Sequence, residues 1–593
     1  MLGKIIGIEE NTVLVNVEID LTKFQSLINL YVVMEEDGKR IVGEITNIKD
    51  NIAYVNLLGE YINDKFVFGV IASPAFSSSV KLISKEKISS IISVDEYKET
   101  EDLYFGESPI YKDVKIAASV DSFFSNHFAI FGSTGSGKSC SVARIIQNLF
   151  EKQSMIPYKA SIFMFDAYGE YHAAFEHIGD KIPGINFKAY TTNLEFADSE
   201  IIKIPIWLLG VDDIALLLGA DKHSQLPIIE KALKLVTIFG QNEKTVMKHK
   251  NDIIARAILD IFASGRQPAQ IRDQVFAVLT TFNTKELNLD SKIVQPGYVR
   301  SLKQCMLIDA TGKMREIELV TNFVESFLSD DLELVLPDGS FKYTLDDLVK
   351  AFDFALISEG VLKSDKIYDE FNSLKVRLHS LANGDYRAYF DYDEYVTRGQ
   401  YIKSLILNNN NQKAQIINFN INYVDDRFAK TLTKIYSKML FDFAKESDNR
   451  ASFPINIVLE EAHRYVQNDI DLEILGYNIF ERIAKEGRKY GVMLGLISQR
   501  PSELSETTLS QCSNFLIFKM LHPRDVEYIR DMVPNITTAI VKRLRVLQPG
   551  TCIAFGSAFK VPVIIRFKMP NPSPSSSSCA VSKIWFIDPK KGK

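Results

Sequence analysis

The segment FAIFGSTGSGKSCSVARIIQNLF, residues 128 to 150, constrains the fold of this chain more than any other feature. Gly132, Gly137, Lys138 and Ser139 fit the spacing G-x-x-x-x-G-K-[ST]. The apolar run before the glycines predicts a buried strand, and the apolar residues after them recur at helical spacing. A strand, a glycine-rich turn and a helix in this order predict a phosphate-binding loop in an α/β domain.

The residue types of this loop suit the end of a nucleoside triphosphate. Glycines let successive backbone N–H groups point inward at phosphate oxygens, and the following helix adds a partial positive charge. Lys138 would neutralise the β- and γ-phosphates, and Ser139 would be a ligand of Mg²⁺. ATP and Mg²⁺ are the predicted cofactors. The candidate nucleotide-binding residues are Gly132, Ser133, Thr134, Gly135, Ser136, Gly137, Lys138, Ser139 and Cys140.

A hydrolytic site needs a second strand that presents acidic residues, and INIVLEEAH at 455–463 is the candidate. Glu460 would bind the metal, although Asp is usual at this position, and Glu461 would address the attacking water. The competing interpretation is a solvated acidic pair that caps a helix beginning at Ala462. His463 is better explained as a hydrogen-bonded structural residue than as a catalytic one.

Two further candidates lie in the segment AKEGRKYGVMLGLISQRP, residues 484–501. Gln499 follows a predicted strand and could hydrogen-bond the attacking water or the γ-phosphate. Arg488 lies at the end of a helix predicted over about 476–489, and its guanidinium could reach the nucleotide of a neighbouring subunit. An amide bonded to loop backbone and a basic surface cluster are the respective alternatives.

Composition and segment patterns predict several domains. The 593 residues are 46% hydrophobic and 24% charged, with a net charge of −6 that does not decide for or against nucleic acid. The expected domains are a small antiparallel β-barrel over 1–95, an α/β core over 96–205 and 411–569, a mainly helical insertion over 206–410, and a linker with a tail over 570–593. The segment EEDGK should form a hairpin turn.

Two classes of protein are not expected. No window approaches eighteen uncharged apolar residues, and Lys4 and Glu9 interrupt any signal sequence, so a cytoplasmic protein without membrane contact is expected. The five cysteines show neither C-x-x-C nor a zinc-type spacing, which predicts reduced thiols.

Four motifs taken together resemble the HerA family of the HerA/FtsK group of ATPases. They are GSTGSGKS at 132–139, FDAYGEY at 165–171, VLEEAHRYV at 458–466, and AKEGRKYGVMLGLISQRPSEL at 484–504. The resemblance covers nearly the whole chain. It implies a RecA-like P-loop NTPase core of the ASCE type, with an N-terminal domain like the family's HAS-barrel and a helical insertion.

The resemblance also assigns residues. It implies that Glu460 and Glu461 form the Walker B pair, that Gln499 senses the γ-phosphate, and that Arg488 acts at a subunit interface. The turn Asp166, Gly169, Glu170 and Tyr171 would lie near the nucleotide, at the end of the strand beside the P-loop strand.

Family members are homo-hexameric rings that use ATP to pull double-stranded DNA through a central pore. The resemblance therefore implies such a motor, paired with a nuclease or NADase effector encoded nearby, in antiphage defence or DNA end processing. A nucleotide-dependent ring scaffold that activates an effector and a monomeric switch protein are the alternatives. Trp585 and Phe586 in the tail would dock on a neighbouring subunit or on their own.

Overall fold

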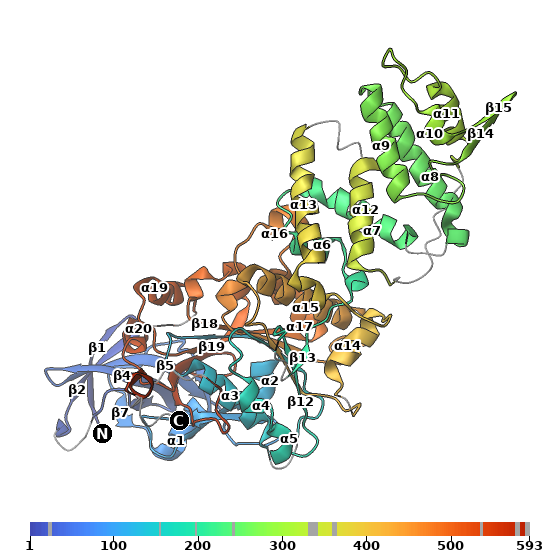
Figure 1. Ribbon diagram of the computed structural model, residues 1–593. Helices are drawn as coiled ribbons and strands as arrows, with labels where there is room; N and C mark the ends of the chain where they lie inside the picture. Colours follow the sequence, from blue (N-terminus) through green and yellow to red (C-terminus); the bar gives the residue numbers. More distant parts are fainter. Residues whose placement is uncertain are drawn as a thin grey trace.

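The structure is a computed structural model of the chain (Figure 1). It describes residues 1–21, 26–152, 156–195, 199–239, 243–329, 342–358, 365–408, 410–533, 536, 538–575 and 581–586. Three parts can be followed along the chain: an N-terminal barrel, a large central sheet covered by helices, and a helical arm that projects from the core (Figure 1).

The N-terminal residues form a closed antiparallel barrel, as predicted. Its order is β2 (Thr12–Val17), β1 (Gly3–Glu9), β7 (Ser79–Leu82), β3 (Tyr31–Glu36), β4 (Lys39–Lys49) and β5 (Ile52–Ile62), with β5 pairing back to β2 and β6 (Lys65–Phe68) added to β5. Alternate apolar residues such as Val13, Val15 and Val17 fill the interior. Asp37 and Gly38 have positive φ in the β3–β4 turn, which confirms the hairpin at EEDGK.

A mixed sheet of twelve strands forms the core. Its order is β13 (Glu200–Ile201), β12 (Phe187–Thr191), β16 (Ile416–Asn420), β11 (Ile162–Asp166), β17 (Ile455–Leu459), β18 (Val492–Ser498), β10 (His127–Phe131), β19 (Cys512–Ile517), β20 (Thr551–Gly556), β21 (Val563–Arg566), β8 (Asp102–Glu107) and β9 (Lys115–Ser119). The strands from β13 to β19 are parallel, and the remaining pairings are antiparallel. The α/β fold class is thus confirmed, whereas one detail of strand order differs: β17 and β18 separate the strand of Asp166 from the P-loop strand β10.

Helices cover both faces of this sheet, because its central strands are buried on both sides. In β10, Phe128 and Ile130 face one apolar layer while Ala129 and Phe131 face the other. The first layer holds α1 (Lys85–Ile92), α2 (Val120–Phe124), α3 (Lys138–Phe150), α4 (His172–Phe175) and α5 (Ile178–Lys181). The second holds α14 (Arg398–Ile406), α15 (Asp426–Glu446), α16 (Asp471–Leu475), α17 (Ile479–Tyr490), α18 (Glu506–Ser510), α19 (Pro523–Met532) and α20 (Thr538–Leu544).

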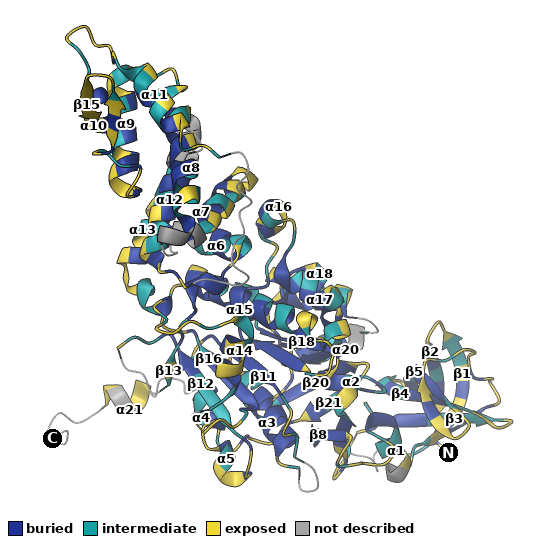
Figure 2. Cartoon of the chain, turned by 90° about the vertical axis from the view of Figure 1, so that its right-hand side faces the viewer, coloured by how far each residue is buried: buried dark blue, intermediate teal, exposed yellow. Residues whose placement is uncertain are grey.

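The arm is built mainly of helices and leaves the core in both views (Figures 1 and 2). It comprises α6 (Val211–Leu218), α7 (Leu226–Phe239), α8 (Glu243–Phe262), α9 (Pro268–Thr281), α10 (Leu302–Cys305), α11 (Ile317–Glu325), α12 (Leu345–Ser358) and α13 (Asp365–Asn383). A hairpin of β14 (Lys292–Gln295) and β15 (Tyr298–Ser301), which the helical periodicity did not predict, lies near its end. At its base, Lys438 on α15 donates to Asp213 on α6 at 3.0 Å.

The chain beyond β21 first follows the core and then leaves it. Gln147 on α3 exchanges two hydrogen bonds with the backbone of Asn571 and Pro572. The short helix α21 (Val581–Trp585) lies beyond this segment (Figure 2). Trp585 at its end and the following Phe586 are 78% and 84% exposed. Docking of these two residues on their own subunit is therefore not seen, whereas docking on a neighbouring subunit stays a prediction; the rest of the tail lies outside the described residues.

The close contact between β18 and β10 yields a prediction about stability. A Cβ at Gly495 would lie 2.4 Å from the ring of Phe128, which is itself stacked on Phe123. We expect Gly495→Ala to destabilise the fold by about 1–3 kcal/mol, because the ring must move in a packed layer. Thermal unfolding measures the effect.

The matched control is Gly399→Ala on α14, where an added Cβ meets no atom within 4 Å. Alanine there should leave the melting temperature unchanged or raise it, since it favours helix by up to about 1 kcal/mol. Equal melting temperatures for the two variants would contradict the described packing of β18 on β10.

Candidate nucleotide and hydrolysis site

The loop between β10 and α3 forms a tight cradle. Gly135 and Gly137 adopt φ values of 72° and 96°, a region that favours glycine. A Cβ on Gly137 would lie 2.6 Å from the backbone nitrogen of Gly550, and one on Gly132 would lie 2.6 Å from the Ser136 hydroxyl. Gly137 is therefore required by both close approach and conformation, Gly132 by close approach, and Gly135 by conformation.

Lys138 begins α3 and turns back over the cradle. Its Nζ donates to the carbonyl oxygens of Gly132, at 2.6 Å, and Ser133, at 3.2 Å. Burial lowers the pKa of Lys138, while the carboxylates of Glu461 and Glu460 act in the opposite direction. A cation is thus held inside the loop, in contact with acceptors that phosphate oxygens could replace.

The turn after β11 brings acidic groups to the start of α3. Asp166, fully buried, accepts hydrogen bonds from the backbone N–H groups of Glu170, at 3.0 Å, and Tyr171, at 2.9 Å. Burial raises the pKa of Glu170, and a hydrogen bond with Ser139 acts against it. Although β11 is not next to β10, its turn therefore reaches the serine predicted to bind Mg²⁺. Motif comparison found this turn, and residue spacing alone gave no signal for it.

Glu460 and Glu461 leave the end of β17 in different directions. Glu460 is buried, and its Oε2 accepts from the backbone N–H of Ala167 at 3.1 Å. Burial, reinforced by the neighbouring Asp166 carboxyl group, raises the pKa of Glu460 well above its usual range. Glu460 is therefore engaged with the Asp166 turn, a contact that the sequence did not predict.

Glu461 adopts φ 48° and ψ 46°, the left-handed region that residues with a Cβ seldom occupy. Its Oε1 accepts from Gln499 Nε2 at 3.1 Å, and Gln499 Oε1 accepts from the Thr134 hydroxyl at 2.7 Å. Burial is the main cause of a raised pKa at Glu461, and the charge of Lys138 opposes it. The amide of Gln499 thus connects the phosphate loop to the acidic residue.

The residues present fit a nucleoside triphosphate with Mg²⁺. The hydroxyls of Ser136 and Ser141 and one carboxylate oxygen of Glu461 are buried without a hydrogen-bond partner in the described part of the chain. At Gly132 and Gly137 the loop has no room for a Cβ. Among the described residues, no group of three or more His, Cys, Asp or Glu side chains is arranged to hold a metal ion. Ser139 would hold Mg²⁺ together with phosphate oxygens, a donor set that suits this ion.

Arg488 is the one predicted catalytic residue that lies elsewhere. It is exposed in the last turn of α17, just before β18 begins, whereas the other end of β18 contacts the loop through the Ser498 carbonyl, 3.3 Å from the Gly132 nitrogen. Its positive charge acts on the buried His127, at the start of β10. Within one chain, Arg488 and Lys138 are therefore at opposite edges of the sheet.

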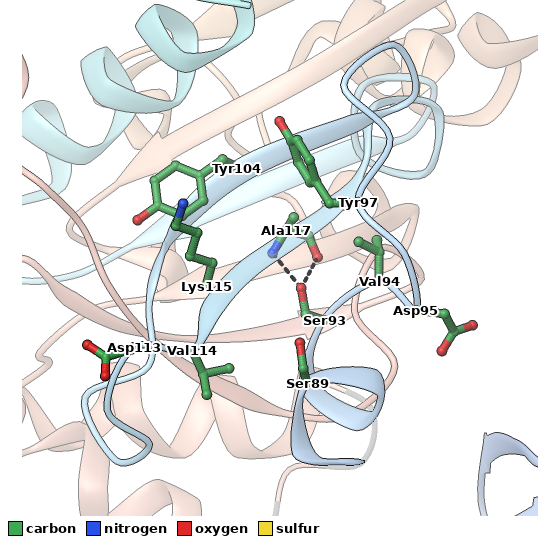
Figure 3. Close-up of a pocket in the computed structure, with 10 residues that line it drawn as sticks. All are labelled: Ser89, Ser93, Val94, Asp95, Tyr97, Tyr104, Asp113, Val114, Lys115 and Ala117. Carbon is green, nitrogen blue, oxygen red and sulfur yellow. Dashed lines mark hydrogen bonds between the residues drawn. The ribbon is translucent and has the colours of Figure 1, made fainter. Parts of the chain in front are cut away.

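A cavity of about 660 Å³ lies apart from these residues, between α1 and the strands β8 and β9 (Figure 3). Tyr97, Tyr104 and Lys115 line it, and the Ser93 hydroxyl bonds the backbone of Ala117 (Figure 3). None of the predicted site residues faces it.

No helix in the described part of the chain is long and apolar enough to cross a membrane.

Comparisons with known proteins agree with these observations. The family described as "Helicase HerA, central domain" matches residues 103–295. The chain is 24% identical to the DNA double-strand break repair helicase HerA of Sulfolobus acidocaldarius, over 94% of this chain and 91% of that protein. It is 22% identical to the protein of the same name from Pyrococcus furiosus, over 77% of this chain and 67% of that protein.

The P-loop, the acidic strand end and the glutamine lie together, and the similarity to HerA proteins extends over most of the chain. Residues 103–295 thus match the HerA central domain, and the chain is similar to HerA helicases over most of its length.

Proposed function

We propose that this chain is the subunit of an ATP-driven motor that moves double-stranded DNA. The observation that carries the proposal is the meeting of Lys138, Glu461 and Gln499 at one edge of the central sheet. Triphosphate hydrolysis needs a cation on the phosphates, a group that positions water and a polar sensor, and these residues supply them. The matched relatives are named as DNA repair helicases, which favours DNA as the moving partner.

Each side chain has a distinct role in this proposal. Lys138 binds the β- and γ-phosphates, and Ser139 is a ligand of Mg²⁺, with Glu460 acting through an intervening water. Bound Mg²⁺ would reduce the repulsion between the phosphates and the buried carboxylates. Glu461 orients the attacking water, and Gln499 exchanges its bond with Thr134 for one to the γ-phosphate.

The proposed assembly is a homo-hexameric ring in which Arg488 serves the neighbouring subunit. Its exposure, and its place at the sheet edge opposite its own Lys138, favour a role across an interface over a role within one chain. Mass photometry with ATP should give particles near six times the 67.1 kDa chain mass. Monomers alone would instead favour a switch protein.

A partner effector, either a nuclease or an NADase, completes the proposal, with antiphage defence or DNA end processing as its setting. The barrel exposes large apolar side chains, among them Ile71 at 89% and Phe76 at 61%, which favour a protein partner on that domain. The same observation supports the second candidate function, a nucleotide-dependent ring that recruits and activates an effector without moving DNA.

Two substitutions should separate binding from hydrolysis. Lys138→Ala should abolish binding of a fluorescent ATP analogue, because the phosphates lose their buried cation. Glu461→Gln should retain binding while DNA-stimulated ATP hydrolysis falls about 10²-fold or more, since the carboxylate that orients water is lost. Glu486→Gln, which alters a carboxylate on α17 paired only at 3.9 Å with Arg482, is the matched control and should behave as wild type.

Hydrolysis that survives Glu461→Gln would contradict the assigned role. If Glu461→Gln stops hydrolysis yet the ring still activates its effector, the scaffold function replaces the motor.

Subunit mixing tests the role of Arg488. Arg488→Ala alone should reduce ATP hydrolysis about 10³-fold, the lower end of the range for an arginine finger. Mixing it with Lys138→Ala should restore part of the activity, because an intact loop can then meet an intact arginine from its neighbour. Lys489→Ala is the control for loss of an adjacent exposed positive charge. No recovery on mixing would contradict action between subunits.

A further inference from the structure

His463 lies against the acidic residue proposed to orient the attacking water, and the inference drawn from it rests on the proposed function. The histidine belongs to the 3₁₀ turn Ala462–Arg464, which follows Glu461. Its Nδ1 lies 3.2 Å from Glu461 Oε2 and 3.1 Å from the Ser498 hydroxyl, and its side chain is 13% exposed. Ser498, at the end of β18, is fully buried.

The Glu461 carboxylate, rather than the Ser498 hydroxyl, favours one tautomer of the ring, because a hydroxyl can either donate to Nδ1 or accept from it. Ser498 Oγ already accepts the backbone N–H of Arg500 at 2.9 Å. If Nδ1 carried no proton, its lone pair would face the Glu461 carboxylate at 3.2 Å and repel it. With a proton on Nδ1, the ring directs its N–H toward Ser498 and toward this carboxylate, so that it can donate to Oε2, which makes no hydrogen bond with the described residues.

The environment favours a neutral ring. Burial lowers the pKa of His463 below its usual value, and the nearby positive charges of Arg500 and Arg464 act in the same direction, against the Glu503 carboxylate. A neutral ring has one N–H group, so its position decides what the histidine can bind.

A donor at this position would restrain the Glu461 side chain, whose backbone is in the left-handed region. Gln499 binds Oε1. In the described part of the chain, Oε2 is buried without a hydrogen-bond partner, and His463 Nδ1 lies 3.2 Å from it. When nucleotide draws Gln499 away, His463 becomes the contact that fixes the carboxylate's direction.

We propose that His463 is a positioning residue: its Nδ1–H, anchored beside Ser498, holds the Glu461 carboxylate toward the attacking water. The histidine does not touch nucleotide or water in this role. It acts through Glu461 alone, which makes its effects separable from those of the nucleotide-binding residues.

Three substitutions of His463 test which ring nitrogen matters. Asparagine can place an amide N–H where Nδ1 lies, glutamine reaches the position of Nε2, and alanine removes both. We expect kcat of ATP hydrolysis to fall about ten- to a hundredfold for His463→Ala and His463→Gln, as loss of a hydrogen bond to a charged group implies. His463→Asn should retain most activity, and KM should change little in all three.

The double variant His463→Ala/Glu461→Gln separates positioning from general structural damage. If the histidine acts through Glu461, the double variant should be no slower than Glu461→Gln alone. Additive losses, a lowered melting temperature that accounts for the loss, or equal activity of the Asn and Gln variants would overturn the proposal.

A readout without hydrolysis keeps the inference independent of the proposed function. Crystal structures of the nucleotide-free variants should show the Glu461 carboxylate displaced in His463→Ala and in its original place in His463→Asn. An unmoved carboxylate in His463→Ala would overturn the positioning role even if the protein is an active ATPase. A displaced carboxylate in a protein that does not hydrolyse ATP would leave the contact standing and reject the motor.

Discussion

The parallel pairing of β17, β18 and β10 is the constraint on which the site depends. Val458 pairs with Gly495, and Phe131 pairs with Ser498, so the three strands end at the same edge of the sheet. Residues from three distant parts of the chain then need only follow their own strands to meet. Because a shift in pairing would turn side chains to the wrong face, the buried layers on both sides keep this register fixed.

Local sequence patterns predict much of the fold and part of the candidate site. The glycine spacing around Lys138 predicts its loop because the positive φ of Gly135 and Gly137 is a local property of the turn. Strand order instead depends on packing between distant segments. The prediction that the Asp166 strand lies next to the P-loop strand is therefore wrong, because β17 and β18 lie between them. The left-handed backbone of Glu461 and the bridge from Thr134 through Gln499 also arise from tertiary contacts. The hairpin in the arm has a local signal, the sequence PG at 296–297 between two short runs that contain β-branched or aromatic residues.

Buried carboxyl groups give the site its chemical character. Glu460 and Glu461 have raised pKa values chiefly because burial disfavours their charged forms. Burial lowers the pKa of Lys138 for the same reason. Burial thus disfavours the charged forms of all three side chains. A bound triphosphate would pair with Lys138, and its Mg²⁺ would pair with the carboxylates, so both charged forms would be stabilised. The contacts that Lys138 and Gln499 make within the loop are ones that phosphate oxygens can replace, so binding and rearrangement are coupled at these two side chains.

The central claim is that a triphosphate binds over Lys138 with its terminal phosphate facing Glu461. A structure of the protein with Mg²⁺ and a non-hydrolysable ATP analogue tests it most directly. The account predicts the γ-phosphate between Lys138 and Gln499, with the bond from Thr134 to Gln499 broken and Glu461 within reach of an ordered water. An analogue bound away from residues 132–139, or a bound phosphate that leaves this bridge intact and Glu461 turned away, would contradict it.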